Sequence, residues 1–178
     1  MLDEIIPVAL QPENLPPFLR VLLATDGTVT RTLEAFFWQP IAVDVLLHDM
    51  MRSSRDYPQI GIERGQHIIV RHVVLRGRDQ QVPYALAHSV IASDRLAPAM
   101  RSELLERRRG IGELLIEARH RTFREILSVR RAPAGEWAAD LEIQAGEPVV
   151  IRQYTIDHGL GPSILIEEVF PECRYVRV

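Results

Sequence analysis

The sequence predicts an α+β fold in which helices pack on a mainly antiparallel sheet of about five to six strands. Two observations carry this prediction. Segments with helical spacing gather toward the N-terminus and the middle of the chain, whereas most other apolar segments alternate with period two and are joined as hairpins. Strands and helices do not alternate along the chain, as they would in a doubly wound parallel sheet.

The N-terminal part predicts two helices followed by a strand. The stretch "LPPFLRVLLATDGTV" opens with a proline pair, typical of a helix start, and reaches a turn signal at Asp26-Gly27. A second short helix is expected over about Thr30 to Phe37. The next stretch, "IAVDVLLH", is short, apolar and β-branched, which favours a buried strand. The polar stretch from Asp49 to Gln66 is expected to be a loop.

The clearest signal is a hairpin in the first half of the chain. "HIIVRHVVL" and "PYALAHSVIA" are period-two runs, and "RGRDQQV" between them is long enough for an irregular turn. In the first arm, Ile69, Arg71, Val73 and Leu75 share one face of the strand. Arg71 is therefore a cation within an apolar row.

The second half predicts more helix and then a second hairpin. "LAPAMRSELLERRRG" has helical spacing and ends at a glycine, and "GIGELLIEA" opens a short helix. "TFREILSV" returns to alternation, with Phe123, Glu125, Leu127 and Val129 expected on one face and a largely polar opposite face. "EPVVIRQYTIDHGLGPSILIEEVFP" is the second hairpin, turned at residues 159–162.

The last predicted strand places a carboxylate among apolar side chains. Ile164, Ile166, Glu168 and Phe170 share a face, and Glu167 points the other way. A buried carboxylate loses hydration and needs a partner. Together with Arg71, Glu168 predicts either a structural salt bridge between strands or a pocket in which Arg71 clamps an anion and Glu168 meets the reacting group. The pattern alone leaves both open.

Composition limits the chemistry. We expect one domain spanning residues 1–178, since 47% of the residues are apolar. The chain has no lysine, which excludes Schiff-base catalysis and a P-loop lysine. The net charge of −3 argues against general nucleic-acid binding. Cys173 is the only cysteine, so neither an internal disulfide nor a thiolate metal cluster is expected.

The sequence gives no sign of a membrane span or a signal peptide, or of three other common kinds of site. No apolar run approaches the roughly 20 residues of a membrane span, and the chain begins with acids where a signal peptide would be basic. We therefore expect a soluble cytoplasmic protein. The histidines do not have the spacing of a helical zinc pair, no Gly-x-Ser-x-Gly elbow is present, and the adjacent Glu167 and Glu168 cannot form a glycosidase dyad.

Four motifs, taken in order, resemble one known family. They are "TDGTVT" followed by "LEA", the arginine within "IIVRHVVL", the helix running into "GIGELL", and "ILIEEVFP". Over roughly residues 15–171 they resemble the chorismate pyruvate-lyase family, the enzymes that make 4-hydroxybenzoate. The resemblance implies a carbon-oxygen lyase with that family's fold, which needs no metal, nicotinamide or flavin. The implied partners are chorismate and an aromatic acid product.

The resemblance also implies functional residues. The family's strand arginine, which holds the ring carboxylate, falls on Arg71, and its late-strand glutamate falls on Glu168, as acid or as base. Backbone contacts from the mid-chain turn and from the segment that closes over the ligand fall on Ile111, Gly112, Val29 and Thr30.

Two further expectations concern the same site. For the second substrate carboxylate, Arg31 and Arg152 are candidates, although each is expected to be a surface arginine. A buried site closed by the "TDGTVT" segment predicts product inhibition.

Two alternatives stay open. "AADLEIQAGEPVVIRQY" resembles the effector-binding domains of bacterial transcription regulators, which share the lyase fold and bind metabolites without turnover. About fifteen residues precede the first expected helix, which leaves no room for a winged-helix domain in this sequence. A non-catalytic protein that binds an aromatic acid therefore remains an alternative. The other alternative is a related lyase that gives a different hydroxybenzoate isomer.

Overall fold

One antiparallel sheet organises the chain. The structure is a computed structural model that describes residues 12–25, 27–96, 98, 101–102, 104, 111–112, 115, 122–159 and 161–176. Within these residues the six strands have the order β1-β2-β3-β6-β5-β4, and all neighbours are antiparallel. The strands are β1 (Ile41–Arg52), β2 (His67–Gly77), β3 (Pro83–Ala92), β4 (Phe123–Pro133), β5 (Pro148–Asp157) and β6 (Pro162–Pro171). The predicted α+β class and both hairpins are confirmed.

Three α-helices are assigned within the described residues: α2 (Pro17–Ala24), α3 (Val29–Phe37) and α6 (Ala138–Leu141). The first two confirm the expected N-terminal helices. A proline opens α2, where the missing N–H costs no intrahelical hydrogen bond. Short 3₁₀ turns lie at Pro12–Asn14, Pro58–Ile60, Ser93–Arg95, Gly135–Trp137 and Glu172–Arg174.

The helices expected over residues 96–110 and 110–118 fall largely outside the described part of the chain. Of these positions, residues 98, 101–102, 104, 111–112 and 115 are helical. No helix among the described residues is long and apolar enough to cross a membrane.

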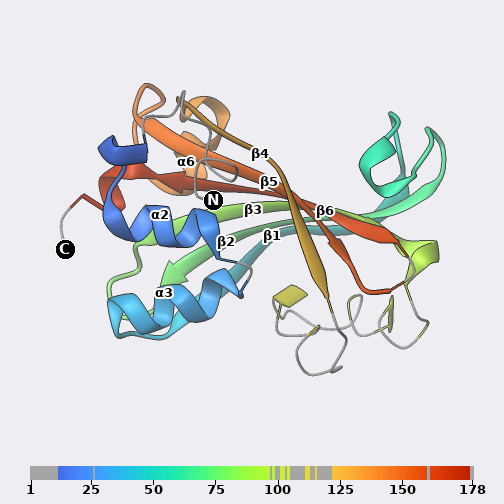
Figure 1. Ribbon diagram of the computed structural model, residues 1–178, viewed down its shortest axis with the longest axis horizontal. Helices are drawn as coiled ribbons and strands as arrows, with labels where there is room; N and C mark the ends of the chain where they lie inside the picture. The colour runs from blue at the N-terminus through green and yellow to red at the C-terminus, as the bar shows by residue number, and fades with distance from the viewer. Residues whose placement is uncertain are drawn as a thin grey trace.

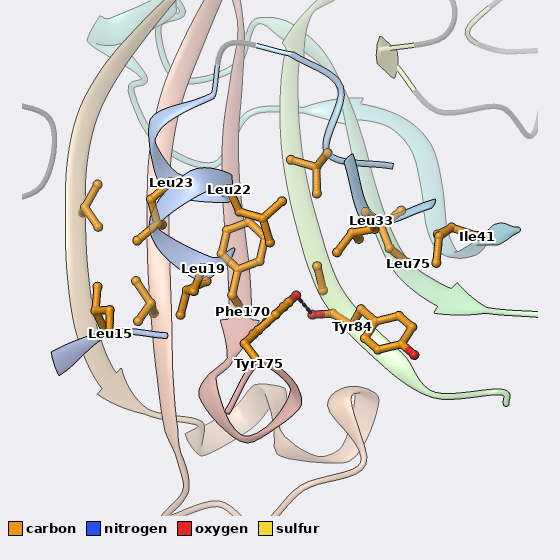
Figure 2. Close-up of a cluster of buried hydrophobic side chains, with 14 of the residues drawn as sticks. Leu15, Leu19, Leu22, Leu23, Leu33, Ile41, Leu75, Tyr84, Phe170 and Tyr175 are labelled. Atoms are coloured by element: carbon orange, nitrogen blue, oxygen red, sulfur yellow. Dashed lines mark hydrogen bonds between the residues drawn. The ribbon is translucent and has the colours of Figure 1, made fainter. Parts of the chain in front are cut away.

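Helices α2 and α3 lie on one face of the sheet (Figure 1). Their leucines pack against side chains of β2, β5 and β6 in a core that includes Leu19, Leu22, Leu33, Leu75, Val150 and Phe170. Near the C-terminus, the Tyr175 hydroxyl donates a hydrogen bond to the Tyr84 carbonyl oxygen at the edge of this core (Figure 2). We call this side of the sheet the inner face.

The opposite face is covered at one end by α6. Ala138 and Leu141 pack against a second apolar row that contains Val74, Leu86, Ile151 and Val169. These residues alternate with those of the inner face, as the pleat of a strand requires. Because both faces are covered, the four central strands are buried along most of their length.

The prediction for the first strand was wrong in two respects. Strand β1 runs on to Arg52, into the stretch expected to be a loop, and it is an edge strand, not a buried one. The pairing with β2 shifts between Val45 and Leu47, which is a bulge. Four large apolar side chains of β1 are exposed, namely Leu46, Leu47, Met50 and Met51.

A second bulge changes which side chains of β4 face inward. The pairing with β5 shifts between Ile126 and Ser128, so Leu127 is the extra residue. Ile126 pairs with Tyr154 before the shift, and Val129 is buried after it. The expectation that Phe123, Leu127 and Val129 share a face was therefore wrong, and Phe123 and Leu127 are exposed.

Candidate functional site

The inner face of the sheet holds a cavity below the turn between α2 and α3. Residues 27–30 cover it from one side, and Ile111 and Gly112 cover it from another. All six strands contribute side chains to its wall, and the uncharged polar ones from the strands are Ser89 and Tyr154. The charged side chains among the described lining residues are Arg71, Arg124 and Glu168.

Glu168 lies at the centre of the inner face. On β6 it pairs with Ala87 of β3 on one side and with Arg152 of β5 on the other. Its exposed fraction is 5%. Glu167, the next residue toward the N-terminus, lies on the opposite face and forms an ion pair with Arg130 at 3.4 Å. The register of β6 thus places the two glutamates on opposite faces of the sheet, as the alternation predicted.

Three hydrogen bonds fix the Glu168 carboxylate. Arg152 donates to Oε2 from Nε at 3.1 Å and from Nη2 at 2.6 Å, and the Tyr154 hydroxyl donates to Oε1 at 3.0 Å. Burial lowers the pKa of Arg152, but Glu168 outweighs this effect, so the pKa of Arg152 is raised. Burial and the Glu168 charge raise the pKa of Tyr154, which stays a neutral donor. Both oxygens accept, as an ionised carboxylate does.

Arg152 also connects Glu168 to the cover of the cavity. Its Nη1 donates to the carbonyl oxygens of Leu22 at 2.7 Å, Leu23 at 3.1 Å and Thr25 at 2.9 Å. The last carbonyls of a helix have no partner within the helix, and a cation there is favoured by the helix dipole. With an exposed fraction of 2%, Arg152 is not the surface arginine that the sequence suggested.

Arg71 lines the same cavity from β2. It is 2% exposed, and its Nη1 lies 3.4 Å from Nδ1 of His48 on β1. Burial lowers the pKa of Arg71, and burial together with Arg71 lowers the pKa of His48. Strand β3 lies between β2 and β6, so the backbones that carry Arg71 and Glu168 are about 10 Å apart. That spacing leaves room for a small ligand between the two side chains.

The two segments that cover the cavity touch each other. A Cβ atom on Gly112 would lie 2.8 Å from Cγ2 of Thr28, closer than real Cβ atoms come to other heavy atoms. Glycine at position 112 therefore allows the mid-chain segment to approach the turn before α3. Val29 and Thr30, both buried, follow directly at the start of α3.

Six site residues expected from the sequence line this cavity: Arg71, Glu168, Val29, Thr30, Ile111 and Gly112. Arg31 does not line it and is exposed on α3. Sequence reasoning missed Tyr154 and Arg124 as lining residues and Arg152 as the partner of Glu168. No group of three or more histidine, cysteine, aspartate or glutamate side chains in the described part of the chain could hold a metal ion.

Comparison with known proteins gives one family match. The family described as chorismate pyruvate-lyase Rv2949c-like matches residues 23–176. The chorismate pyruvate-lyase of Mycobacterium tuberculosis (strain H37Rv) is 28% identical over 156 residues, which cover 85% of this chain and 78% of that protein. The chorismate pyruvate-lyase of Mycobacterium leprae is 29% identical over 153 residues, covering 85% and 73%.

Solved structures with this fold include regulators. PhnF from Mycobacterium smegmatis superposes with a TM-score of 0.67 at 14% identity, covering 86% of this chain and 67% of that chain. The C-terminal domain of the histidine utilization repressor from Pseudomonas syringae pv. tomato gives a TM-score of 0.61 at 14% identity, covering 78% and 95%. At this identity the likeness establishes the fold alone.

Proposed function

Because the chain belongs to the Rv2949c-like chorismate pyruvate-lyase family, we propose that it eliminates pyruvate from chorismate and releases 4-hydroxybenzoate. The observation that carries the proposal is that a buried cation and a buried carboxylate line the same cavity. A buried arginine, Arg71, and a buried carboxylate, Glu168, line it from strands about 10 Å apart. A ligand with an acidic group at one end and its reacting carbons at the other matches this arrangement.

In the proposed mechanism Arg71 binds the ring carboxylate. A guanidinium can give two parallel charge-assisted hydrogen bonds to a carboxylate, which fix the ring in position and in plane. Holding the ring relative to Glu168 supplies the orientation that an elimination needs. Backbone groups of Val29, Thr30, Ile111 and Gly112 would contact the ligand from the cover of the cavity.

Glu168 then acts as the base. Its carboxylate takes the proton from the ring carbon that bears the hydroxyl group, and the neighbouring ring carbon-oxygen bond breaks. The C–H electron pair becomes the third double bond of an aromatic ring, and the C–O pair leaves with the enolpyruvate oxygen. The proton is returned to the departing enolpyruvate, which becomes pyruvate. No electrons are gained or lost overall, so the step requires no redox cofactor.

The surroundings of Glu168 favour a base over an acid. Arg152 and Tyr154 donate to its two oxygens, and a protonated carboxyl would have to give up one of these contacts. We therefore assign the ionised form to the resting enzyme. The same contacts hold the carboxylate in one orientation toward the cavity.

The test is an incubation of the purified chain with chorismate in buffer that contains a metal chelator and no cofactor. The proposal predicts pyruvate and 4-hydroxybenzoate in equal amounts. Pyruvate with another hydroxybenzoate isomer would keep the lyase and change its product. Tight binding of 4-hydroxybenzoate without any pyruvate would identify a non-catalytic binding protein and overturn the proposal.

A further inference from the structure

One buried guanidinium joins the carboxylate of the cavity to the end of α2. Arg152 uses Nε and Nη2 for Oε2 of Glu168, and it uses Nη1 for three carbonyl oxygens, those of Leu22, Leu23 and Thr25. All three nitrogen atoms are therefore engaged inside the protein. Arg152 is not among the described residues that line the cavity, so it can affect a ligand only through the groups that it holds.

The end of α2 is connected to the cover of the cavity, residues 27–30. Thr25 caps the helix, and its N–H donates to the carbonyl oxygen of Val21 at 3.0 Å. The Thr25 hydroxyl accepts a hydrogen bond at 3.1 Å from the N–H of Gly27, the first residue of the cover. Whatever holds the end of α2 against the sheet therefore also positions the cover.

The burial of Arg152 depends on the charge of Glu168. The two side chains are 2% and 7% exposed, and Glu168 is the carboxylate that pairs with Arg152 among the described residues. The carbonyl oxygens at the end of α2 supply only partial negative charges. If Glu168 is neutral, the same arrangement encloses a cation without a counter-ion, which is costly. That cost falls when the end of α2 moves away and lets water reach the guanidinium.

We propose that Arg152 is a positioning residue that holds the end of α2, and with it the cover, against the sheet only while Glu168 is ionised. This inference rests on the proposed lyase function, in which the ionised carboxylate is the base. Its consequence is that the cavity is covered only when Glu168 is able to take a proton. A molecule whose Glu168 already carries a proton has a loosened cover and does not hold substrate for a step that it cannot start.

The test measures amide hydrogen exchange in the protein without ligand. Glu168→Gln keeps the shape of the side chain and removes its charge, so a charge-assisted contact of Arg152 becomes a neutral one. The amides of Thr25 and of the last turn of α2 should then exchange about 10- to 100-fold faster. They should still exchange faster than the amides of β3 and β6, because the expected event is a local opening and not unfolding of the sheet.

Three further variants separate the charge of Glu168 from other effects. Glu167→Gln removes the same charge on the opposite face and should leave exchange at the end of α2 unchanged. Tyr154→Phe removes the hydrogen bond to Oε1 of Glu168 but leaves the contacts of Arg152 in place, so it should also have little effect there. Arg152→Lys keeps a cation beside Glu168, but one ammonium group does not span Oε2 and the carbonyl oxygens as a guanidinium does. The end of α2 should therefore exchange faster in this variant too.

Two results would overturn the role of Arg152. One is an unchanged exchange rate at the end of α2 in Glu168→Gln or in Arg152→Lys. The other is an exchange rate at the end of α2 that equals the rate of the β3 and β6 amides, since the whole domain then unfolds. The lyase proposal fails separately, if the wild type releases no pyruvate from chorismate. The exchange rates still decide the link between Glu168 and the cover, because they are measured without substrate.

Discussion

Arg152 and Glu168 form a buried ion pair with Nη2 and Oε2 2.6 Å apart, between neighbouring strands at the centre of the sheet. This ion pair has two roles. It neutralises a carboxylate that would otherwise be costly to bury, and it leaves that carboxylate at the wall of a cavity. The sequence left a choice between an Arg71–Glu168 ion pair and a functional site. The ion-pair partner of Glu168 is Arg152, and Glu168 lines the same cavity as Arg71.

The first prediction concerns stability. Arg152→Met should lower the free energy of unfolding by about 3–5 kcal/mol, because it leaves the Glu168 charge buried without a partner. Arg130→Met removes the partner of the adjacent glutamate, but that pair is partly exposed and should contribute about 1 kcal/mol or less. Urea denaturation of the two variants measures the difference. Equal losses would mean that Glu168 does not depend on Arg152.

The second prediction concerns the contact between the two covering segments. Gly112→Ala should weaken the binding of 4-hydroxybenzoate, because the added methyl group meets Cγ2 of Thr28 and pushes the segments apart, at a cost of about 1–3 kcal/mol. Calorimetry measures the change in Kd. Gly146→Ala is the matched control, since nothing lies within 4 Å of a Cβ placed there.

A second substitution should repair this defect. Thr28→Ser removes the methyl group that the Gly112→Ala side chain meets, so the double variant should recover most of the lost affinity. If Thr28→Ser brings no recovery, the contact between the segments is not what limits binding.

Much of this site could be predicted from the sequence because period-two alternation holds wherever a strand is regular. Arg71 and Glu168 interrupt apolar rows on β2 and β6, and each occupies the inner face that its pattern predicts. The same signal was present in "VVIRQYTI", where Arg152 stands in an apolar row between Val150 and Tyr154. It was missed because an arginine in an isolated strand gives no sign of the carboxylate that will pair with it.

Bulges mark where the prediction failed. A single extra residue moves every later side chain of a strand to the other face, and it leaves no mark in composition. Leu127 has this effect in β4: Arg124 and Ile126 before the bulge and Val129 after it all lie on the inner face, whereas strict alternation would place Val129 on the opposite face from the other two. The shift at Leu46 in β1 likewise exposes side chains that were expected to be buried.

The third prediction is a dependence on pH at the partner of Arg71. The pKa of His48 is lowered in the folded protein by burial and by Arg71, so the unfolded chain binds a proton more readily. Stability should therefore fall as the pH drops below about 6.5, the ordinary value for histidine, and continue to fall through the lowered value. His48→Asn should lose less stability than the wild type between pH 7.5 and pH 5.

Thermal melting across this pH range measures the effect. Other titrating groups, including His88, are common to both proteins and cancel in the difference. If the wild type and His48→Asn lose stability in parallel, the pKa of His48 is the same in the folded and the unfolded protein, and the lowered pKa is wrong.

The most direct measurement is the rate of pyruvate release from chorismate by Glu168→Gln and Glu167→Gln, each scaled to the amount of folded protein. These neighbours lie on opposite faces of one strand, and one of them lines the cavity. Glu168→Gln should lower the rate by about 100- to 10,000-fold, the usual contribution of a general base. Glu167→Gln should retain most of the wild-type rate. A Glu168→Gln variant that turns chorismate over as fast as Glu167→Gln would contradict the assignment of Glu168 as the base.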